Sequence, residues 1–201
     1  MLAAAVQIAP PLVECTYDRQ ALLALSPTAF DQDLQGGWRP LAQRPECLEV
    51  AADLLAQYRQ AQWANLTPGD LHSNYWHEGQ LRAELGQKDR AIRLLLAGVN
   101  PNVLSDGFSD YALGTVAFLN NEMEGLQAAR TRLMATPEPA NWAETSAGFR
   151  ERFGAEMKWP INLNVLDGLV ACFGRPYKEA YGVACQTIGA ETRGEMSGTT
   201  R

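Results

Sequence analysis

Apolar residues recur at helical spacing through most of this chain, and glycine, proline or asparagine interrupts the pattern at short intervals. Leu48, Ala51, Leu55 and Tyr58, for example, follow the three- and four-residue steps of one helix face. Alanine and leucine supply 29 and 25 residues, whereas valine and isoleucine supply only 9 and 4. Because valine and isoleucine favour strands, the pattern predicts an all-α fold.

The interruptions predict a single helical domain over residues 1–188. Within it we expect an irregular arm over residues 1–45, a helical core over 46–135 and capping helices over 140–188, followed by a mobile tail over 189–201. Thr67 and Pro68 are typical of a helix start, with Thr67 as the N-cap, and Gly86 is typical of a helix end. Short turns between successive helices predict antiparallel neighbours.

The core contains an internal repeat. A shift of 35 residues places Gly79 on Gly114 and Gly86 on Asn121. A small residue at 79 allows the paired helix to approach closely, and Gly86 allows the chain to turn. We therefore expect two helical hairpins of similar construction.

The first hairpin resembles the tetratricopeptide repeat, a pair of antiparallel helices of about 34 residues. The matching residues are Tyr75, Gly79, Gly86, Ala91 and Leu95. Glu78 and Arg82 depart from the family pattern, which has a leucine and an aromatic residue there, and Asp110 departs from it in the second hairpin. The resemblance covers about residues 70–135 and implies hairpins stacked as a short right-handed solenoid. A generic helical bundle is the alternative. Residues 30–33, 36–39 and 172–177 also resemble segments of bacterial proteins without a known activity.

The same resemblance implies a binding groove, because ligand contacts in this family come from the inner helix of each pair. Carried onto this sequence, the partner-binding residues are Ser73, Trp76, His77, Gln80, Glu84, Tyr111 and Thr115. The implied function is a non-enzymatic binding or scaffold module for a peptide or protein partner. Trp76 and Tyr111 are equally well interpreted as packing residues.

Catalytic and metal-binding patterns are missing from the sequence. His72 and His77 are the only histidines, and five residues along a helix turn them about 140° apart. His77 and Glu78 begin an HExxH pattern, but Leu81 stands where the second ligand is needed. The chain also lacks GxSxG, GxxxxGK[ST] and GxGxxG. We therefore expect no catalytic residue, metal or cofactor.

An alternative function remains open. The chain could be an enzyme or a small-molecule binder with a pocket between the N-terminal arm and the helices, lined by Trp38, Trp76 and His77. Trp38 itself is expected to fold back onto the core.

Charge and hydropathy argue against nucleic-acid binding and against a transmembrane segment. The chain has 17 basic and 23 acidic residues, a net charge of -6, so it lacks the basic surface typical of nucleic-acid binding. No apolar run approaches the roughly 18 residues needed for a transmembrane helix. The N-terminal residues are interpreted either as an ordinary N-terminus or as the remainder of a trimmed export signal.

The four cysteines allow three full pairings. If residues 176–188 form one helix antiparallel to its predecessor, the Cα atoms of Cys172 and Cys185 lie roughly 12 Å apart. A disulfide spans at most ~7 Å between Cα atoms. This disfavours a bridge between them. We expect a Cys15–Cys47 disulfide if the protein is exported, and free thiols if it is not. A periplasmic or secreted location is favoured over a cytoplasmic one, and a structural protein of the cell envelope, with its arm pinned by Cys15–Cys47, is a further possibility.

Overall fold

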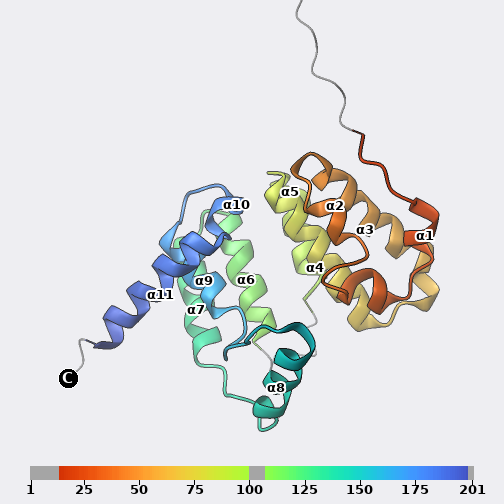
Figure 1. The fold of residues 1–201 in the computed structure, drawn as a ribbon. Helices are drawn as coiled ribbons and strands as arrows, with labels where there is room; N and C mark the ends of the chain where they lie inside the picture. Colours follow the sequence, from red (N-terminus) through yellow and green to blue (C-terminus); the bar gives the residue numbers. More distant parts are fainter. Residues whose placement is uncertain (1–13, 100–106, 199–201) are drawn as a thin grey trace, which may run out of the picture.

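The chain is all-α in the computed structural model, which describes residues 14–99 and 107–198 and has no strand within them (Figure 1). The helices are α1 (Arg19–Leu23), a π-helical segment (Thr28–Gln32), α2 (Arg39–Ala42), two 3-10 turns (Pro45–Cys47 and Trp63–Asn65), α3 (Leu48–Gln62), α4 (Pro68–Glu84), α5 (Lys88–Ala97), α6 (Phe108–Leu119), α7 (Met123–Met134), α8 (Trp142–Phe153), α9 (Leu163–Ala171), α10 (Tyr177–Ala180) and α11 (Val183–Gly198). None of these helices is long and apolar enough to span a membrane. The prediction of an all-α fold is confirmed.

Local signals place the boundaries of the central helices as predicted. Thr67 caps α4: its Oγ1 accepts from the Asp70 N–H at 3.2 Å, and Asp70 Oδ2 accepts from the Thr67 N–H at 3.0 Å. Pro68 is the first residue of α4. Gly86 and Asn121 adopt φ values of +73° and +59° in the turns that follow α4 and α6. These turns require left-handed backbone, which glycine and asparagine adopt at the lowest cost.

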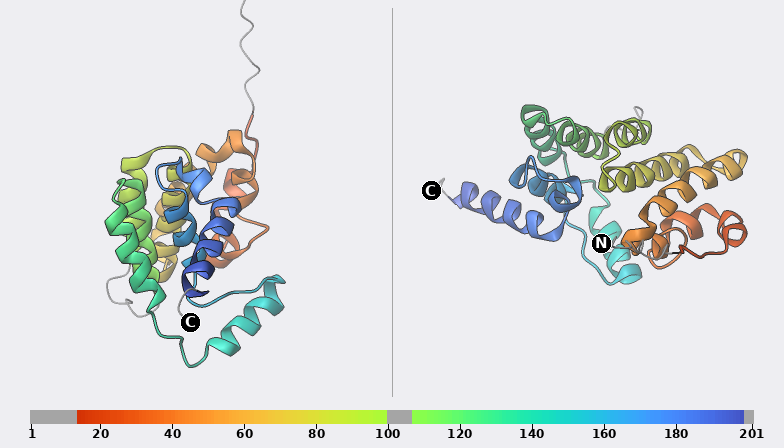
Figure 2. Two further views of the ribbon diagram at one scale, coloured as in Figure 1. Left: turned by 90° about the vertical axis from the view of Figure 1, so that its left-hand side faces the viewer. Right: turned by 90° about the horizontal axis from the view of Figure 1, so that it is seen from above.

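The helices pack mainly in pairs: α4 with α5, α6 with α7, and α9 with α11 (Figures 1 and 2). α3 packs along α4, while α5 contacts α6 and α7 contacts α9. Gly79 lies where α4 crosses α5, and a Cβ there would come within 2.8 Å of the Leu95 side chain. The close approach expected at this glycine is therefore present.

The N-terminal arm is more regular than predicted, because it packs on α3 and shares a core with it. The Phe30 ring stacks on Tyr58 with centroids 3.6 Å apart, and the Tyr58 hydroxyl donates to the Leu25 carbonyl at 2.7 Å. Trp38 is buried, as expected, and α1, α2 and the π-helical segment all lie within this arm. The arm from Glu14 onward is thus part of the folded body.

Glu78 and Arg82, the two departures from the repeat pattern, belong to a buried charge network. Both side chains are fully buried on α4. The Glu78 carboxylate pairs with Arg59 from α3, with Arg82 Nε at 3.1 Å and with the Arg90 guanidinium of α5 at 2.8 Å. Arg82 also pairs with Asp53 of α3. The network binds three helices together at positions where the repeat family has apolar side chains.

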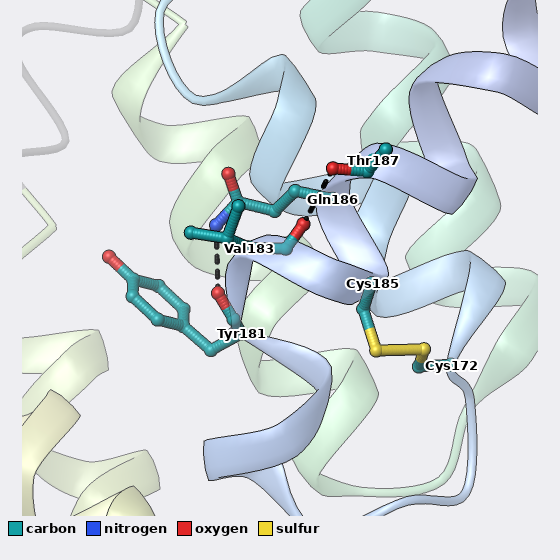
Figure 3. Close-up of a disulfide and its surroundings, with 6 residues drawn as sticks. All are labelled: Cys172, Tyr181, Val183, Cys185, Gln186 and Thr187. Atoms are coloured by element: carbon teal, nitrogen blue, oxygen red, sulfur yellow. Dashed lines mark hydrogen bonds between the residues drawn. A yellow bond between two sulfur atoms is a disulfide. The ribbon is translucent and has the colours of Figure 1, made fainter.

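Both cysteine pairs are bridged. Cys15–Cys47 is present, as expected for an exported chain, with a Cα–Cα distance of 5.6 Å. Cys172–Cys185 is present too, at 5.9 Å, so the prediction against it is wrong. That prediction assumed one helix after Pro176, whereas α10 ends at Ala180, Gly182 lies between the helices, and α11 begins at Val183. Figure 3 shows the result: Cys185, in the first turn of α11, meets Cys172 at the end of α9.

The boundary expected at residue 188 is also wrong, because α11 continues to Gly198. Gly189 packs so closely on α9 that a Cβ there would lie 2.4 Å from the Asp167 carbonyl carbon. Asp167 pairs with Arg130 of α7 at 2.6 Å and with Arg193 of α11 at 2.8 Å. Contacts beyond residue 188 therefore hold α11 in place; residues 199–201 of the expected tail lie outside the described residues.

Candidate functional site

A cavity of about 520 Å³ lies between α4 and α6, within the size range of small-molecule sites. α4 supplies much of the wall, and the arm, the end of α5, the start of α6, the residue before α9 and the residue after α10 supply the rest. The lining residues are Gln32, Gly69, His72, Ser73, Trp76, His77, Gln80, Gly98, Phe108, Tyr111, Asn162 and Tyr181. Segments far apart in the sequence therefore build one site.

Aromatic rings form the apolar part of this cavity. The Trp76 ring lies 4.9 Å from both the Phe108 and the Tyr111 ring centroids. Trp76 and Tyr111 are 5% and 2% exposed and belong to the main core. They are packing residues, as one interpretation of the sequence had it, and they also present an edge to the cavity.

Gln80 and Tyr181 close one end of the cavity. The Gln80 amide donates to the Tyr181 hydroxyl at 3.1 Å and to the Tyr111 hydroxyl at 3.4 Å. Burial, followed by the proximity of Tyr181 and Tyr177, raises the pKa of the Tyr111 phenol well above its ordinary value. The phenol of Tyr111 therefore stays protonated. Through this hydrogen bond Tyr181 links the C-terminal part of the fold to α4.

An aspartate from the arm orients His77. Asp31 Oδ1 lies 2.7 Å from His77 Nδ1 and accepts from Trp38 Nε1 at 2.9 Å, while Asp31 Oδ2 accepts from the Gln32 amide at 2.9 Å. Burial alone would raise the pKa of the Asp31 carboxyl, but the hydrogen bonds and charges of His77, Trp38 and Arg39 outweigh it and hold that pKa below its usual value. Asp31 is thus a carboxylate, so His77 Nδ1 donates to it and Nε2 is the ring nitrogen available to a ligand.

The polar groups of the cavity wall are uncharged amides and hydroxyls together with the two imidazoles. Among the described residues that line it there is no Lys, Arg, Asp or Glu. Asp31 lies behind His77 and is already hydrogen bonded. The described wall therefore offers hydrogen-bond donors and acceptors but no lysine, arginine or carboxylate to neutralise a charged ligand.

The structure brings together most of the predicted partner-binding residues. Ser73, Trp76, His77, Gln80 and Tyr111 all line the cavity. Glu84 and Thr115 do not. Thr115 is fully buried, and its hydroxyl donates to the Tyr111 carbonyl at 3.0 Å, so it offers no surface to a partner.

Glu84 lies near the end of α4, which α10 covers. Burial raises the pKa of its carboxyl, and Lys178 of α10 partly offsets the effect. Glu84, which is half-buried, stays outside the cavity wall, and the prediction for Thr115 is wrong because that side chain is buried in the core. Trp38 of the alternative pocket does not line the cavity either; it is buried against Asp31.

Sequence reasoning missed the residues that complete the wall. His72 lines the same cavity as His77 although the two point in different directions around α4. Gln32, Asn162 and Tyr181 come from the arm and the C-terminal helices. No periodic signal links these positions to α4; Asn162 is distinguished only by its left-handed backbone, with φ of +66°.

A second, smaller cavity of about 290 Å³ adjoins the first and shares Phe108 and Asn162 with it. Its other lining residues are Pro139, Trp142, Thr145, Trp159 and Ile161. The Trp142 and Trp159 rings meet edge to face at 5.2 Å. This cavity is more strongly apolar than the first.

Searches of protein-family models, of curated proteins and of solved structures found no match to this chain. The site is therefore interpreted from its own geometry.

Proposed function

We propose that this protein is a binding protein whose cavity between α4 and α6 holds a small, uncharged polar ligand. The observation that carries the proposal is the pair of hydrogen bonds from Gln80 to Tyr181 and Tyr111 at one end of the cavity. A long extended peptide would need the surface of α4 and α6 to stay open past Gln80, where Tyr181 lies. A compact ligand fits the space that remains.

The chemistry of the wall supports an uncharged ligand. A charged group that enters such a site loses hydration, and the described wall holds no Lys, Arg, Asp or Glu to compensate the loss. Hydroxyl and amide groups, in contrast, match the side chains of Ser73, Gln80 and Asn162 and the free nitrogen of His77. The aromatic edges of Trp76 and Phe108 favour a ligand that also has apolar faces.

We further propose that the protein works in an oxidising compartment such as the periplasm or the extracellular space. The Cys15–Cys47 and Cys172–Cys185 disulfides support this, because such bridges persist outside the reducing cytosol. The pairing of α4 with α5 and of α6 with α7 supports a tetratricopeptide-like arrangement as the scaffold of the cavity.

Occluding the cavity tests the proposal. Ser73 lines it, so Ser73→Trp should fill part of the space. Thr131→Trp places the same ring on an exposed position of α7 that lines neither the α4–α6 cavity nor the Trp142–Trp159 cavity. The probes are methyl β-glucoside and N-acetylalanine methylamide as neutral ligands, with glucuronate as a charged comparison, measured by ligand-observed NMR.

The expected result is that at least one neutral probe binds the wild type and Thr131→Trp, that Ser73→Trp loses at least tenfold in affinity, and that glucuronate binds more weakly than methyl β-glucoside. Binding that Ser73→Trp leaves unchanged would show that the ligand site is elsewhere. Tighter binding of glucuronate would overturn the assignment of an uncharged ligand.

A further inference from the structure

The apolar cavity beside the candidate site lies between α8 and the body of the protein. Trp142 is the first residue of α8, and Trp159 and Ile161 belong to the segment that leads to α9. Ile161 is 37% exposed, which is high for a large apolar side chain. The lining contains no charged residue among the described positions.

One wall of this cavity is fixed by a hydrogen bond. Trp159 Nε1 donates to the Thr136 carbonyl at 2.9 Å, which fixes the ring, and the Trp142 ring packs edge to face on it. α8 itself has no fully buried residue. The space between α8 and α6 is thus bounded by oriented rings but is not filled by the side chains of the chain itself.

The two cavities are adjacent, because Phe108 and Asn162 line both of them. The first of these adjacent cavities offers amides, hydroxyls and imidazole, and the second offers two tryptophans, a proline and an isoleucine. A ligand with a single chemical character matches only one end. A ligand with a polar and an apolar part matches both.

We propose that the ligand is a neutral amphiphile, with an uncharged hydroxyl- or amide-bearing head in the α4–α6 cavity and an apolar chain or ring in the Trp142–Trp159 cavity. This inference rests on the proposed function and adds the second half of the ligand. Asn162 lines both cavities, so its amide can contact the part of the ligand that joins the head to the tail.

Two homologous series of probes, here called ladders, test the inference. They are the alkyl β-glucosides from methyl to octyl and the N-alkyl acetamides of the same chain lengths. All are used below the concentrations at which they form micelles. The glucosides carry a hydroxyl head and the acetamides carry an amide head, so the two series show which head group the cavity prefers. Isothermal titration calorimetry gives the dissociation constant for each member.

In at least one ladder, each added methylene is expected to tighten binding up to about fourfold until the apolar cavity is full. Ile161→Asn should weaken binding of the long-chain members several-fold and leave the methyl member unchanged. Leu96→Asn is the matched control, since Leu96 is an exposed apolar residue on α5 outside both cavities, and it should change neither. Both substitutions are at partly exposed positions, so folding is expected to be retained.

The outcomes separate the two proposals. If the methyl members bind but octyl binds no tighter, the amphiphile inference is wrong and the proposed function stands. If the gain with chain length is the same in Ile161→Asn and Leu96→Asn, the tail does not lie in the Trp142–Trp159 cavity and the inference is wrong. If no member of either ladder binds, both proposals are wrong.

Discussion

Replacing Glu78 by leucine is expected to destabilise the protein strongly. Glu78 is fully buried, and its carboxylate pairs with Arg59, Arg82 and Arg90. Removing it leaves the Arg59 guanidinium without a carboxylate partner in the interior and leaves Arg82 with only the half-exposed Asp53. Breaking a buried ion pair in this way typically costs about 3–5 kcal/mol. The repeat pattern has leucine at this position, so an argument from the family consensus predicts a neutral or stabilising effect. The loss of the ion pairs thus predicts a lower free energy of unfolding for Glu78→Leu, whereas the family consensus predicts an unchanged or higher one.

Urea denaturation followed by circular dichroism measures this loss directly, as the change in the free energy of unfolding at constant m-value. In thermal unfolding the same loss should lower the Tm by roughly 6–20 °C, since about 2–4 °C corresponds to 1 kcal/mol in a chain of this size. The effect should persist at high salt, because buried pairs are screened much less than exposed ones.

Asp53→Asn supplies the matched control. Asp53 pairs with Arg82 in the same network, but its side chain is 52% exposed, so its loss should cost about 1 kcal/mol or less. If Glu78→Leu proves as mild as Asp53→Asn, or stabilises the fold, the description of a buried network that holds α3, α4 and α5 together is wrong.

Three further predictions concern stability. Replacing both Cys172 and Cys185 by alanine should cost about 3 kcal/mol in equilibrium unfolding, the entropy of the loop that the disulfide closes, and no loss in oxidised protein would contradict the bridge. Gly189→Ala should cost about 1–3 kcal/mol because its Cβ would meet backbone, whereas Gly194→Ala, with open space around it, should be neutral or stabilising in the same denaturation assay; equal effects would refute the close packing of α9 on α11. Burial raises the pKa of the Tyr58 phenol to about 12 from 10.0, so the folded state favours the protonated form, and this stabilisation is present below pH 10 and is lost as the pH rises from 10 to 12. Tyr58→Phe should flatten the fall in stability over that pH range, and an unchanged pH profile would argue against the burial of this hydroxyl.

The parts of the fold that follow from neighbouring residues could be predicted from the sequence. Thr67 and Pro68 begin α4 through contacts within four residues, and Gly86 and Asn121 supply left-handed backbone at single positions. Apolar spacing identifies the buried faces for the same reason, since each step of the pattern is local.

The closure of the site could not be predicted in this way. The Gln80–Tyr181 hydrogen bond joins residues 101 positions apart, and the Asp31–His77 contact joins residues 46 apart. The position of Tyr181 depends on the break between α10 and α11 at Gly182, a glycine that fits the helical pattern of residues 176–188. The prediction against the Cys172–Cys185 disulfide was wrong for the same reason, because it assumed a continuous helix, which places Cys185 far from Cys172.

Glu78 presents a different difficulty. A charged residue in a helix normally indicates a solvent-exposed face. Glu78 is instead buried, and its partners Arg59 and Arg90 lie on other helices. Its position within the repeat pattern was the available signal, since a charge at a conventionally apolar position of a stacked hairpin needs a partner in the core.

The five tryptophans allow a direct test of the central claim, that a neutral ligand occupies the cavity between α4 and α6 and extends toward α8. Indole N–H signals in a ¹⁵N-correlated NMR spectrum report on Trp76 in the first cavity and on Trp142 and Trp159 in the second, while Trp63 lies outside both. Hexyl β-glucoside is expected to shift the signals of Trp76, Trp142 and Trp159 and to leave that of Trp63 in place. Shifts confined to Trp63, or no shift of Trp76 at saturating probe, would contradict the claim.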